Sequence, residues 1–139
     1  MVGFGSGGVH IALANADGTF ADPFFAFAGF GAEALAGGWT SNDLYYRTVG
    51  DLDGDGNADL VGFGDGGVYA AYGNGAGGFA DAELVVAGFG AGASAGSWTS
   101  HDLYPRMLAD LNGDGAADIV GFGDGGVIAA TSASDWVLV

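Results

Sequence analysis

Two nine-residue segments of this sequence carry oxygen atoms at the spacing that a hard cation requires. Each has oxygen-bearing side chains at positions 1, 3, 5 and 9, a backbone carbonyl available at position 7, and glycines where the chain must bend. Calcium takes six to eight oxygen ligands at about 2.3–2.6 Å, whereas magnesium requires a smaller octahedron that keeps its waters. We therefore expect Ca²⁺ as the cofactor. The candidate metal ligands are Asp51, Asp53, Asp55, Asn57 and Asp59 in the first segment, and Asp110, Asn112, Asp114, Ala116 and Asp118 in the second.

Each segment begins like an EF-hand loop but does not continue as one. The twelfth position, where an EF-hand has a bidentate Glu, is Gly62 in the first segment and Gly121 in the second. The residues that follow read as strand, so we predict a calcium-binding β-hairpin. The alternative is an ordinary Asp-Gly turn without an ion, but carboxylates crowded so closely repel one another unless a cation lies among them. The first segment has four carboxylates and the second three, which predicts tighter binding at the first. The ion would be structural, because no general base for metal-assisted hydrolysis stands nearby.

A second recurring constellation could bind a small polar ligand. The pattern Trp-Thr-Ser-x-Asp-Leu-Tyr-x-Arg occurs twice and contains the only two basic side chains. It offers hydrogen-bond donors, an acceptor and flat apolar faces, a mixture that suits a sugar. Equally, the Trp residues could be buried core and the Arg residues could neutralise the acidic loops. The candidate ligand-binding residues are Trp39, Asp43, Tyr45 and Arg47 in the first copy, and Trp98, His101, Asp102, Tyr104 and Arg106 in the second.

Other polar residues at recurring positions have simpler interpretations. His101 replaces Asn42 of the first copy and could contact a ligand in one site only, or could be an exposed loop residue. Asp65 and Asp124 follow Gly-Phe-Gly and are interpreted as turn formers.

The chain is built from an internal repeat. An offset of 59 residues aligns the Val-Gly-Phe-Gly that begins at Val2 with the same four residues beginning at Val61 and at Val120. We divide the single domain 1–139 into repeat 1 (1–59), repeat 2 (60–118) and a partial repeat 3 (119–139). A period of this size indicates a solenoid or a propeller.

Within each repeat, short apolar segments are separated by glycine-rich turns, which predicts an all-β fold of four-stranded antiparallel units. No segment has a helical period with caps. The glycine-rich stretches 31–38 and 90–97 are expected to be wide inter-strand loops. The predicted strands are Ala58–Phe63, Val68–Tyr72, Ala82–Ala87 and Leu103–Leu108.

Composition excludes several classes of function. The 139 residues include 17 acidic and 2 basic side chains, a formal net charge of -15, which disfavours nucleic acid and anionic membrane surfaces as partners. No apolar run approaches the roughly 20 residues needed for membrane insertion. The first residues have neither the basic region nor the apolar stretch of a signal peptide, so we expect none in this chain. Without cysteine there is no disulfide framework and no thiolate metal site.

Taken together, the Asp-rich loop, the Val-Gly-Phe-Gly strand and the period resemble the FG-GAP repeat of integrin-like β-propellers. The unit is more similar to propeller lectins of the Psathyrella velutina lectin type, in which a stretch like Tyr104-Pro105-Arg106 precedes the loop. In that family the loop joins the innermost strand A to strand B. The resemblance implies an A strand at Leu103–Leu108, B at Ala117–Phe122, C at Val127–Thr131 and D at Trp136–Val139, with the chain beginning at a B strand.

The resemblance also implies a function. Such lectins bind N-acetylglucosamine, and sometimes sialic acid, between adjacent blades; with so little positive charge, we expect N-acetylglucosamine-type glycans here. A propeller ring needs roughly four to eight blades, so the chain is expected to be a partial propeller completed by homo-oligomerisation, with two or three copies per ring left open. The family implies an extracellular or secreted protein. The alternative is a structural or protein-adhesion propeller without a sugar site. An enzyme is disfavoured because there is no nucleophile elbow and no recurring His partner, although paired glycosidase carboxylates would leave no local signature.

Overall fold

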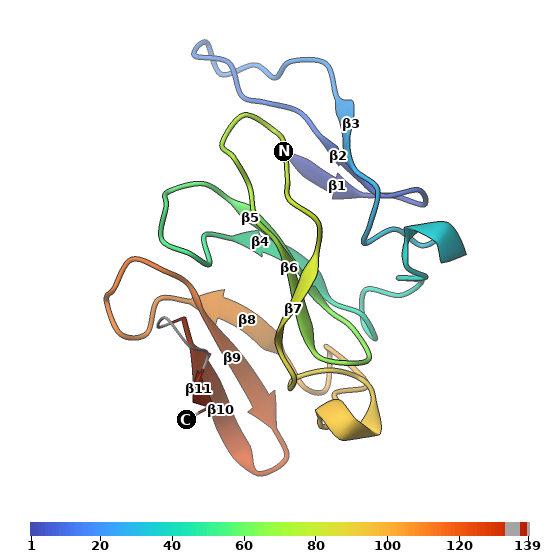
Figure 1. The fold of residues 1–139 in the computed structure, drawn as a ribbon, viewed down its shortest axis with the longest axis vertical. Coiled ribbons are helices and arrows are strands. Elements are labelled where there is room, and N and C mark those ends of the chain that lie inside the picture. The colour runs from blue at the N-terminus through green and yellow to red at the C-terminus, as the bar shows by residue number, and fades with distance from the viewer. Residues whose placement is uncertain (133–136, 139) are drawn as a thin grey trace.

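Three antiparallel sheets follow one another along the chain and are stacked along the long axis of the molecule (Figure 1). This computed structural model describes residues 1–132 and 137–138. The first sheet contains β1 (Val2–Phe4), β2 (Val9–Ile11) and β3 (Phe24–Phe27). The second contains β4 (Arg47–Gly50), β5 (Asp59–Phe63), β6 (Val68–Ala71) and β7 (Glu83–Val86). The third contains β8 (Arg106–Ala109), β9 (Asp118–Gly123), β10 (Gly126–Thr131) and β11 (Val137–Leu138).

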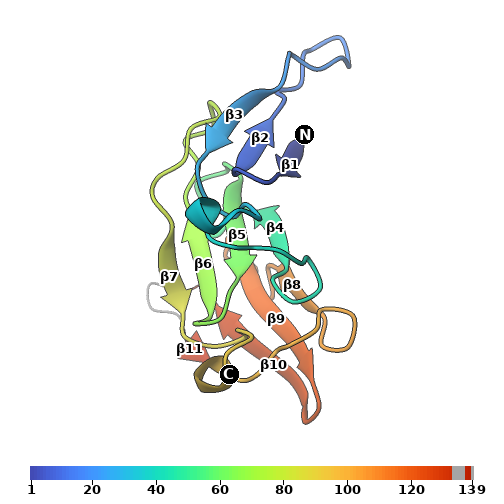
Figure 2. The same cartoon turned by 90° about the vertical axis from the view of Figure 1, so that its right-hand side faces the viewer.

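Each sheet is a blade of consecutive strands, which confirms the all-β, four-stranded antiparallel prediction. In the second sheet the order is β4-β5-β6-β7, and the third repeats it as β8 to β11. The sequence repeat therefore begins one strand into each sheet. The first sheet has three strands, and its β1 corresponds to β5, as the resemblance implied. Figure 2 shows the three sheets from the side.

The predicted strands of the second and third sheets agree with the structure to within one residue at each described end, except at one boundary. Leu103–Leu108 was expected to be a strand from its first residue, but β8 begins at Arg106. The preceding residues form a turn because the Leu103 N–H donates to Ser100 Oγ (3.2 Å) and the Tyr104 N–H donates to the Ser100 carbonyl (2.9 Å). The ends Trp136 and Val139 of the expected D strand lie outside the described residues.

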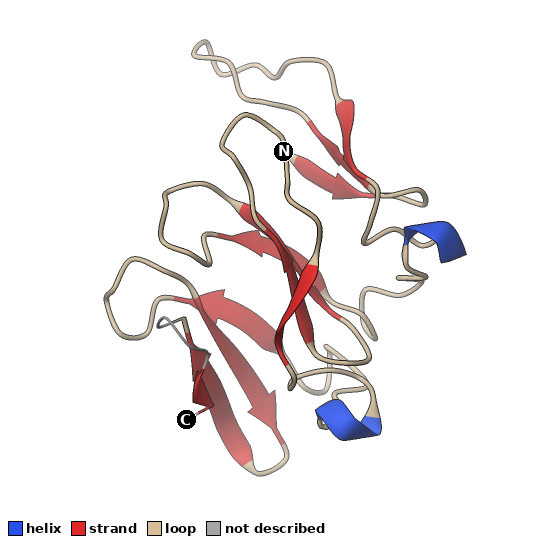
Figure 3. Ribbon diagram, viewed as in Figure 1, coloured by secondary structure: helices blue, strands red, loops and turns tan. Residues whose placement is uncertain are grey.

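The glycine-rich stretches are more ordered than the predicted wide loops. Each contains one turn of 3-10 helix, η1 at Ala34–Ala36 and η2 at Ala93–Ala95. Both turns end at a glycine in the left-handed region, Gly37 with φ 105° and Gly96 with φ 103°. The two turns lie on the same side of the molecule (Figure 3). No helix in the described part of the chain is long and apolar enough to cross a membrane.

The apolar core consists of two clusters, one at each junction between sheets. The first joins Val9 and Ile11 of the first sheet to Leu60 and Ala71 of the second. The second joins residues such as Phe63 of the second sheet to residues such as Ile119 of the third. Every residue of β5 is buried, because the central sheet is covered on both faces. Burying a side chain such as Phe63 stabilises the fold by about 1.5–3 kcal/mol, so the junctions hold the stack together.

The glycine that follows valine in the Val-Gly-Phe-Gly strands of the second and third sheets is required by close packing. A Cβ atom on Gly62 would lie 2.7 Å from atoms of the Phe30 and Trp39 rings, and one on Gly121 would lie 2.7 Å from the Trp98 ring. The missing side chain thus provides the seat for the indole that precedes each sheet.

Candidate functional site

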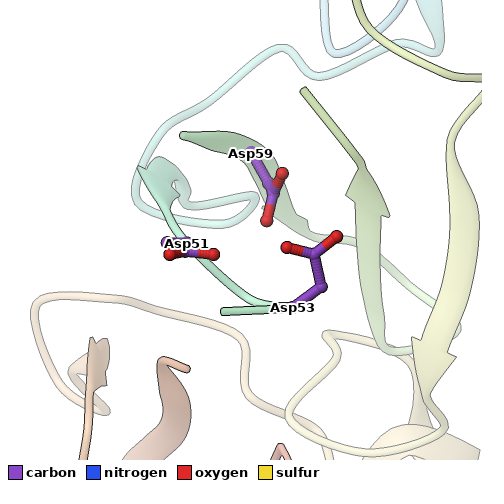
Figure 4. A group of neighbouring side chains, drawn as sticks. All are labelled: Asp51, Asp53 and Asp59. Atoms are coloured by element: carbon purple, nitrogen blue, oxygen red, sulfur yellow. The ribbon is translucent and has the colours of Figure 1, made fainter. Parts of the chain in front are cut away.

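The first Asp-rich segment forms the connection between β4 and β5. Its carboxylates Asp51, Asp53 and Asp59 converge, with one oxygen of each lying within 4.8 Å of the others (Figure 4). The loop is shaped by its own backbone: the N–H groups of Gly54 and Gly56 each donate to Asp51 at 2.8 Å. Both glycines have positive φ, 76° and 87°, which a residue with a side chain adopts only with strain.

The buried end of this cluster is Asp59, which is fully inaccessible to solvent. Its carboxylate accepts hydrogen bonds from the backbone N–H of Leu52 (2.7 Å) and Gly73 (2.8 Å). Burial, reinforced by the nearby charges of Asp53 and Asp51, raises the pKa of Asp59, and burial together with like charges also raises the pKa of Asp53. The ionised forms of these two carboxylates are therefore disfavoured unless a positive charge lies beside them.

The other two predicted ligands of this loop, Asp55 and Asn57, are hydrogen-bonded to each other. Asp55 accepts hydrogen bonds from the backbone N–H (2.8 Å) and the side-chain amide (2.9 Å) of Asn57, and these bonds lower the pKa of Asp55. The three converging carboxylates supply only hard oxygen atoms, which fits calcium. A bound ion would draw further oxygens from the position 5 side chain and the position 7 carbonyl.

The second Asp-rich segment, between β8 and β9, repeats the hydrogen bonds of the first. Asp110 accepts from the N–H of Gly113 (2.7 Å) and Gly115 (3.0 Å), and buried Asp118 accepts from Leu111 N–H (2.7 Å). The Asp114 carboxylate accepts hydrogen bonds from the Asn112 side-chain amide (3.0 Å) and from the Ala116 backbone N–H (2.9 Å). The two loops touch, because the Ala117 N–H donates to the Asp51 carbonyl at 2.7 Å.

A cleft lies between the first and second sheets. It has a volume of about 680 Å³, and its lining includes Trp39 and Tyr45 of the predicted ligand set. The Trp39 ring is half-buried and meets Tyr45 edge to face at a centroid distance of 5.7 Å. The Tyr45 hydroxyl donates to the Asp65 carboxylate at 3.2 and 3.3 Å. We call this cleft 1.

Cleft 2 repeats cleft 1 at the next junction. It has a volume of about 360 Å³ and is lined by residues that include Trp98, Tyr104, Asp124 and Ile128. The Tyr104 hydroxyl donates to Asp124 at 3.2 Å. Hydrogen bonding to Asp124 raises the pKa of Tyr104, and burial followed by the Asp65 charge raises that of Tyr45, so both phenols stay protonated. Each cleft therefore combines an indole, a phenol and a carboxylate, with Ile128 in place of Tyr69.

The two arginines of the predicted ligand set donate hydrogen bonds to backbone carbonyls. Arg106 is fully buried and donates to the carbonyls of Phe89 (3.2 Å), Trp98 (3.3 Å) and Asp43 (3.4 Å). Its guanidinium lies 5.2 Å from the centroid of the Phe63 ring, and burial lowers its pKa to about 10, so it stays charged at neutral pH.

Arg47 holds the equivalent place at the other junction. It donates to the Phe30 carbonyl at 2.8 Å and lies 5.5 Å from the Phe4 ring centroid. Phe30 and Phe89 have positive φ values of 55° and 60°, which are rare for a residue with a ring. Each arginine thus fixes the carbonyl of a strained residue.

Asp43 and His101 connect adjacent sheets. The Asp43 carboxylate accepts from Ser100 Oγ (3.0 Å) and from the Asp102 N–H (2.8 Å), and its carbonyl accepts from the His101 N–H (2.6 Å). The His101 ring stacks on Tyr46 at a centroid distance of 3.7 Å. Asp102 is the repeat equivalent of Asp43 and is exposed.

The structure places two acids in the clefts that the sequence suggested only as turn formers. Asp65 and Asp124 stand in the tight turns after β5 and β9, and each receives the hydroxyl of a cleft tyrosine. Their recurrence at the same repeat position was the available signal. In the first repeat this position is Ser6, so the acid recurs in only two of the three copies, which weakened the signal.

Comparisons with known proteins agree with this architecture. Residues 51–121 match the family described as FG-GAP-like repeat. A solved structure of a lectin from Agrocybe aegerita, described as specifically recognising non-reducing terminal N-acetylglucosamine, superposes with a TM-score of 0.86 at 36% sequence identity. The match covers 99% of this chain and 34% of that lectin, so the chain spans about a third of its length. No curated protein matches the sequence significantly.

Proposed function

The chain belongs to the FG-GAP-like repeat family, and we propose that it is a non-enzymatic carbohydrate-binding module that takes N-acetylglucosamine-type sugars in the clefts between its blades. The observation that carries the proposal is the duplicated Trp-Tyr-Asp set of clefts 1 and 2. A sugar presents C–H faces to an indole and hydroxyls to a carboxylate, so each set offers both kinds of contact. The recognition of terminal N-acetylglucosamine by the similar lectin supports the choice of sugar.

The test is titration calorimetry with N-acetylglucosamine on the full chain in calcium. We expect weak binding to each cleft, with avidity only when several clefts engage one multivalent glycan. The variant with both Asp65→Ala and Asp124→Ala should lose binding while keeping its melting temperature, because both carboxylates are exposed. Asp22→Ala, an exposed acid outside the clefts, is the matched control. A wild-type chain that is silent on a glycan array would favour a protein-adhesion role.

We also propose that the two Asp-rich loops hold calcium and that the ions are structural. The support is the convergence of Asp51, Asp53 and Asp59, whose like charges raise the free energy of the empty loop. When bound, calcium would supply the positive charge that lets these carboxylates stay together. Heating the chain with calcium and with a chelator tests this proposal. An unchanged melting temperature would remove it.

We propose further that the open face of the third sheet is covered by a second copy of the chain. The exposed fractions of Leu111, Phe122 and Val127 are 54%, 40% and 62%. Their repeat equivalents Leu52, Phe63 and Val68 lie under the third sheet and are 2%, 0% and 0% exposed.

The same surface is thus already used as an interface once within the chain, which supports a further blade as its occupant. Static light scattering measures the mass, and a stable monomer at micromolar concentration would contradict association. A glycan-binding role also suggests a secreted protein, which detection of the full-length product outside the producing cell would test.

A further inference from the structure

Cleft 1 extends well beyond the residues that would hold one sugar ring. Its lining reaches from Asp65, in the turn before β6, to Asp81, in the loop after β6. A strand rises about 3.3 Å per residue, so the four residues of β6 alone span roughly 13 Å. That length exceeds one pyranose ring.

The far part of cleft 1 has its own aromatic platform and acceptor. Phe27 of β3 and Phe79 of the β6–β7 loop both line it, and their rings meet edge to face at a centroid distance of 6.4 Å. Both rings are half-buried and so keep accessible surface. Asp81 stands beside them, exposed, and its carboxylate accepts no hydrogen bond from the described residues.

We propose that cleft 1 has a second subsite, formed by Phe27, Phe79 and Asp81, that binds a second pyranose ring, so that cleft 1 takes a disaccharide. This inference rests on the proposed function. An aromatic ring stacks on the C–H face of a pyranose, and a carboxylate accepts hydrogen bonds from two neighbouring hydroxyls. An apolar ligand group has no hydroxyls and would leave the Asp81 carboxylate without a partner.

Cleft 2 provides a comparison within the same chain. Its lining has Ile128 at the repeat position of Tyr69. The repeat position of Phe27 is Val86 in the sequence, and Val86 is not among the lining residues of cleft 2. The repeat position of Phe79 is Leu138 in the sequence. Cleft 2 is therefore expected to bind the terminal sugar alone. The substitution Phe79→Leu gives cleft 1 the residue that the sequence has at the repeat position.

The experiment compares N-acetylglucosamine with its β-1,4-linked disaccharide by titration calorimetry. The full chain carries Asp124→Ala so that only cleft 1 binds, and calcium is present. We expect the disaccharide to bind about tenfold more tightly than the monosaccharide, a factor that corresponds to one good stacking contact. Phe79→Leu should reduce this advantage to about twofold and leave the affinity for the monosaccharide unchanged.

The second variant is Asp81→Asn. Because Asp81 is exposed, we expect this variant to fold like the wild type. It should also lower the affinity for the disaccharide only. If both sugars bind equally and both variants are neutral, the second subsite does not exist while the proposed function stands. If neither sugar binds, the proposed function fails and takes this inference with it.

Discussion

Replacing Arg106 with methionine would decide whether this residue binds sugar or holds the blades together. The side chain is fully buried and donates to three carbonyls, two of them buried, on Phe89 and Trp98. A buried acceptor left without a partner costs about 1–3 kcal/mol, and the guanidinium over the Phe63 ring adds about 0.5–2 kcal/mol. Removing the buried charge recovers part of this.

We therefore expect Arg106→Met to lower the free energy of unfolding by about 3 kcal/mol. For a chain of this size that corresponds to a melting temperature lower by about 10 °C. Arg47→Met is the matched control, because Arg47 is only half-buried and donates to the single carbonyl of Phe30. It should cost about 1 kcal/mol.

Calorimetric melting and sugar titration are measured on both variants. The structural role requires that Arg106→Met melts lower and that, at a temperature where it remains folded, it still binds N-acetylglucosamine. A variant that melts with the wild type but no longer binds would refute this reasoning and assign Arg106 to the ligand. Equal losses of stability at the two positions would refute the argument that the cost depends on the number of carbonyls that each arginine contacts.

Three further predictions address the pH response, the metal loops and association. His101 Nδ1 accepts a hydrogen bond from the backbone N–H of Arg106 (3.3 Å). Burial and then the Arg106 charge lower the His101 pKa from 6.5, and the charges of Asp102 and Asp43 oppose this only in part. Because the folded state disfavours protonation of His101, the free energy of unfolding should fall as pH drops below 6.5. Since Asn42 Oδ1 accepts the Arg47 N–H in the same way, His101→Asn should melt with a shallower dependence between pH 7 and 5, and identical pH profiles would contradict the role of His101. Asn112→Asp gives the second loop the fourth carboxylate of the first, so calcium titration should show the weaker site tightening, while Asn15→Asp, outside the loops, leaves both sites unchanged. Phe122→Asp should lower the mass seen by light scattering because it charges the open face, whereas Leu84→Asp, also exposed but on β7, should not.

The sequence was sufficient for the blades because the same pattern recurs. Glycine turns and apolar segments defined β5, β6 and β7 to within one residue at each end. The strands of the third sheet followed from the resemblance to propeller lectins, which the 59-residue repeat supports. The start of β8 was missed because Ser100 closes a turn through both its hydroxyl and its carbonyl, a local interaction that hydrophobic pattern does not report.

The site was harder to predict because the sequence gives residue types and not the direction of side chains. Arginine beside tryptophan suggested a sugar contact, and only the structure shows the guanidinium on backbone carbonyls. Asp65 suggested a turn and does form one, but the same turn presents its carboxylate to Tyr45 in the cleft.

The two interpretations of the tryptophans, buried core and sugar platform, are compatible with each other in this structure. A Cβ atom on Gly62 would collide with Trp39 Cη2, and one on Gly121 with Trp98 Cη2, so one edge of each indole is fixed in the junction. The same two rings also line the clefts. Because the glycine seats the ring that a sugar would meet, the platform is rigid before a ligand arrives, which reduces the entropy lost on binding. Enlarging Gly62 should therefore weaken sugar binding at cleft 1 and destabilise the junction together, whereas a change at Asp65 should affect binding alone.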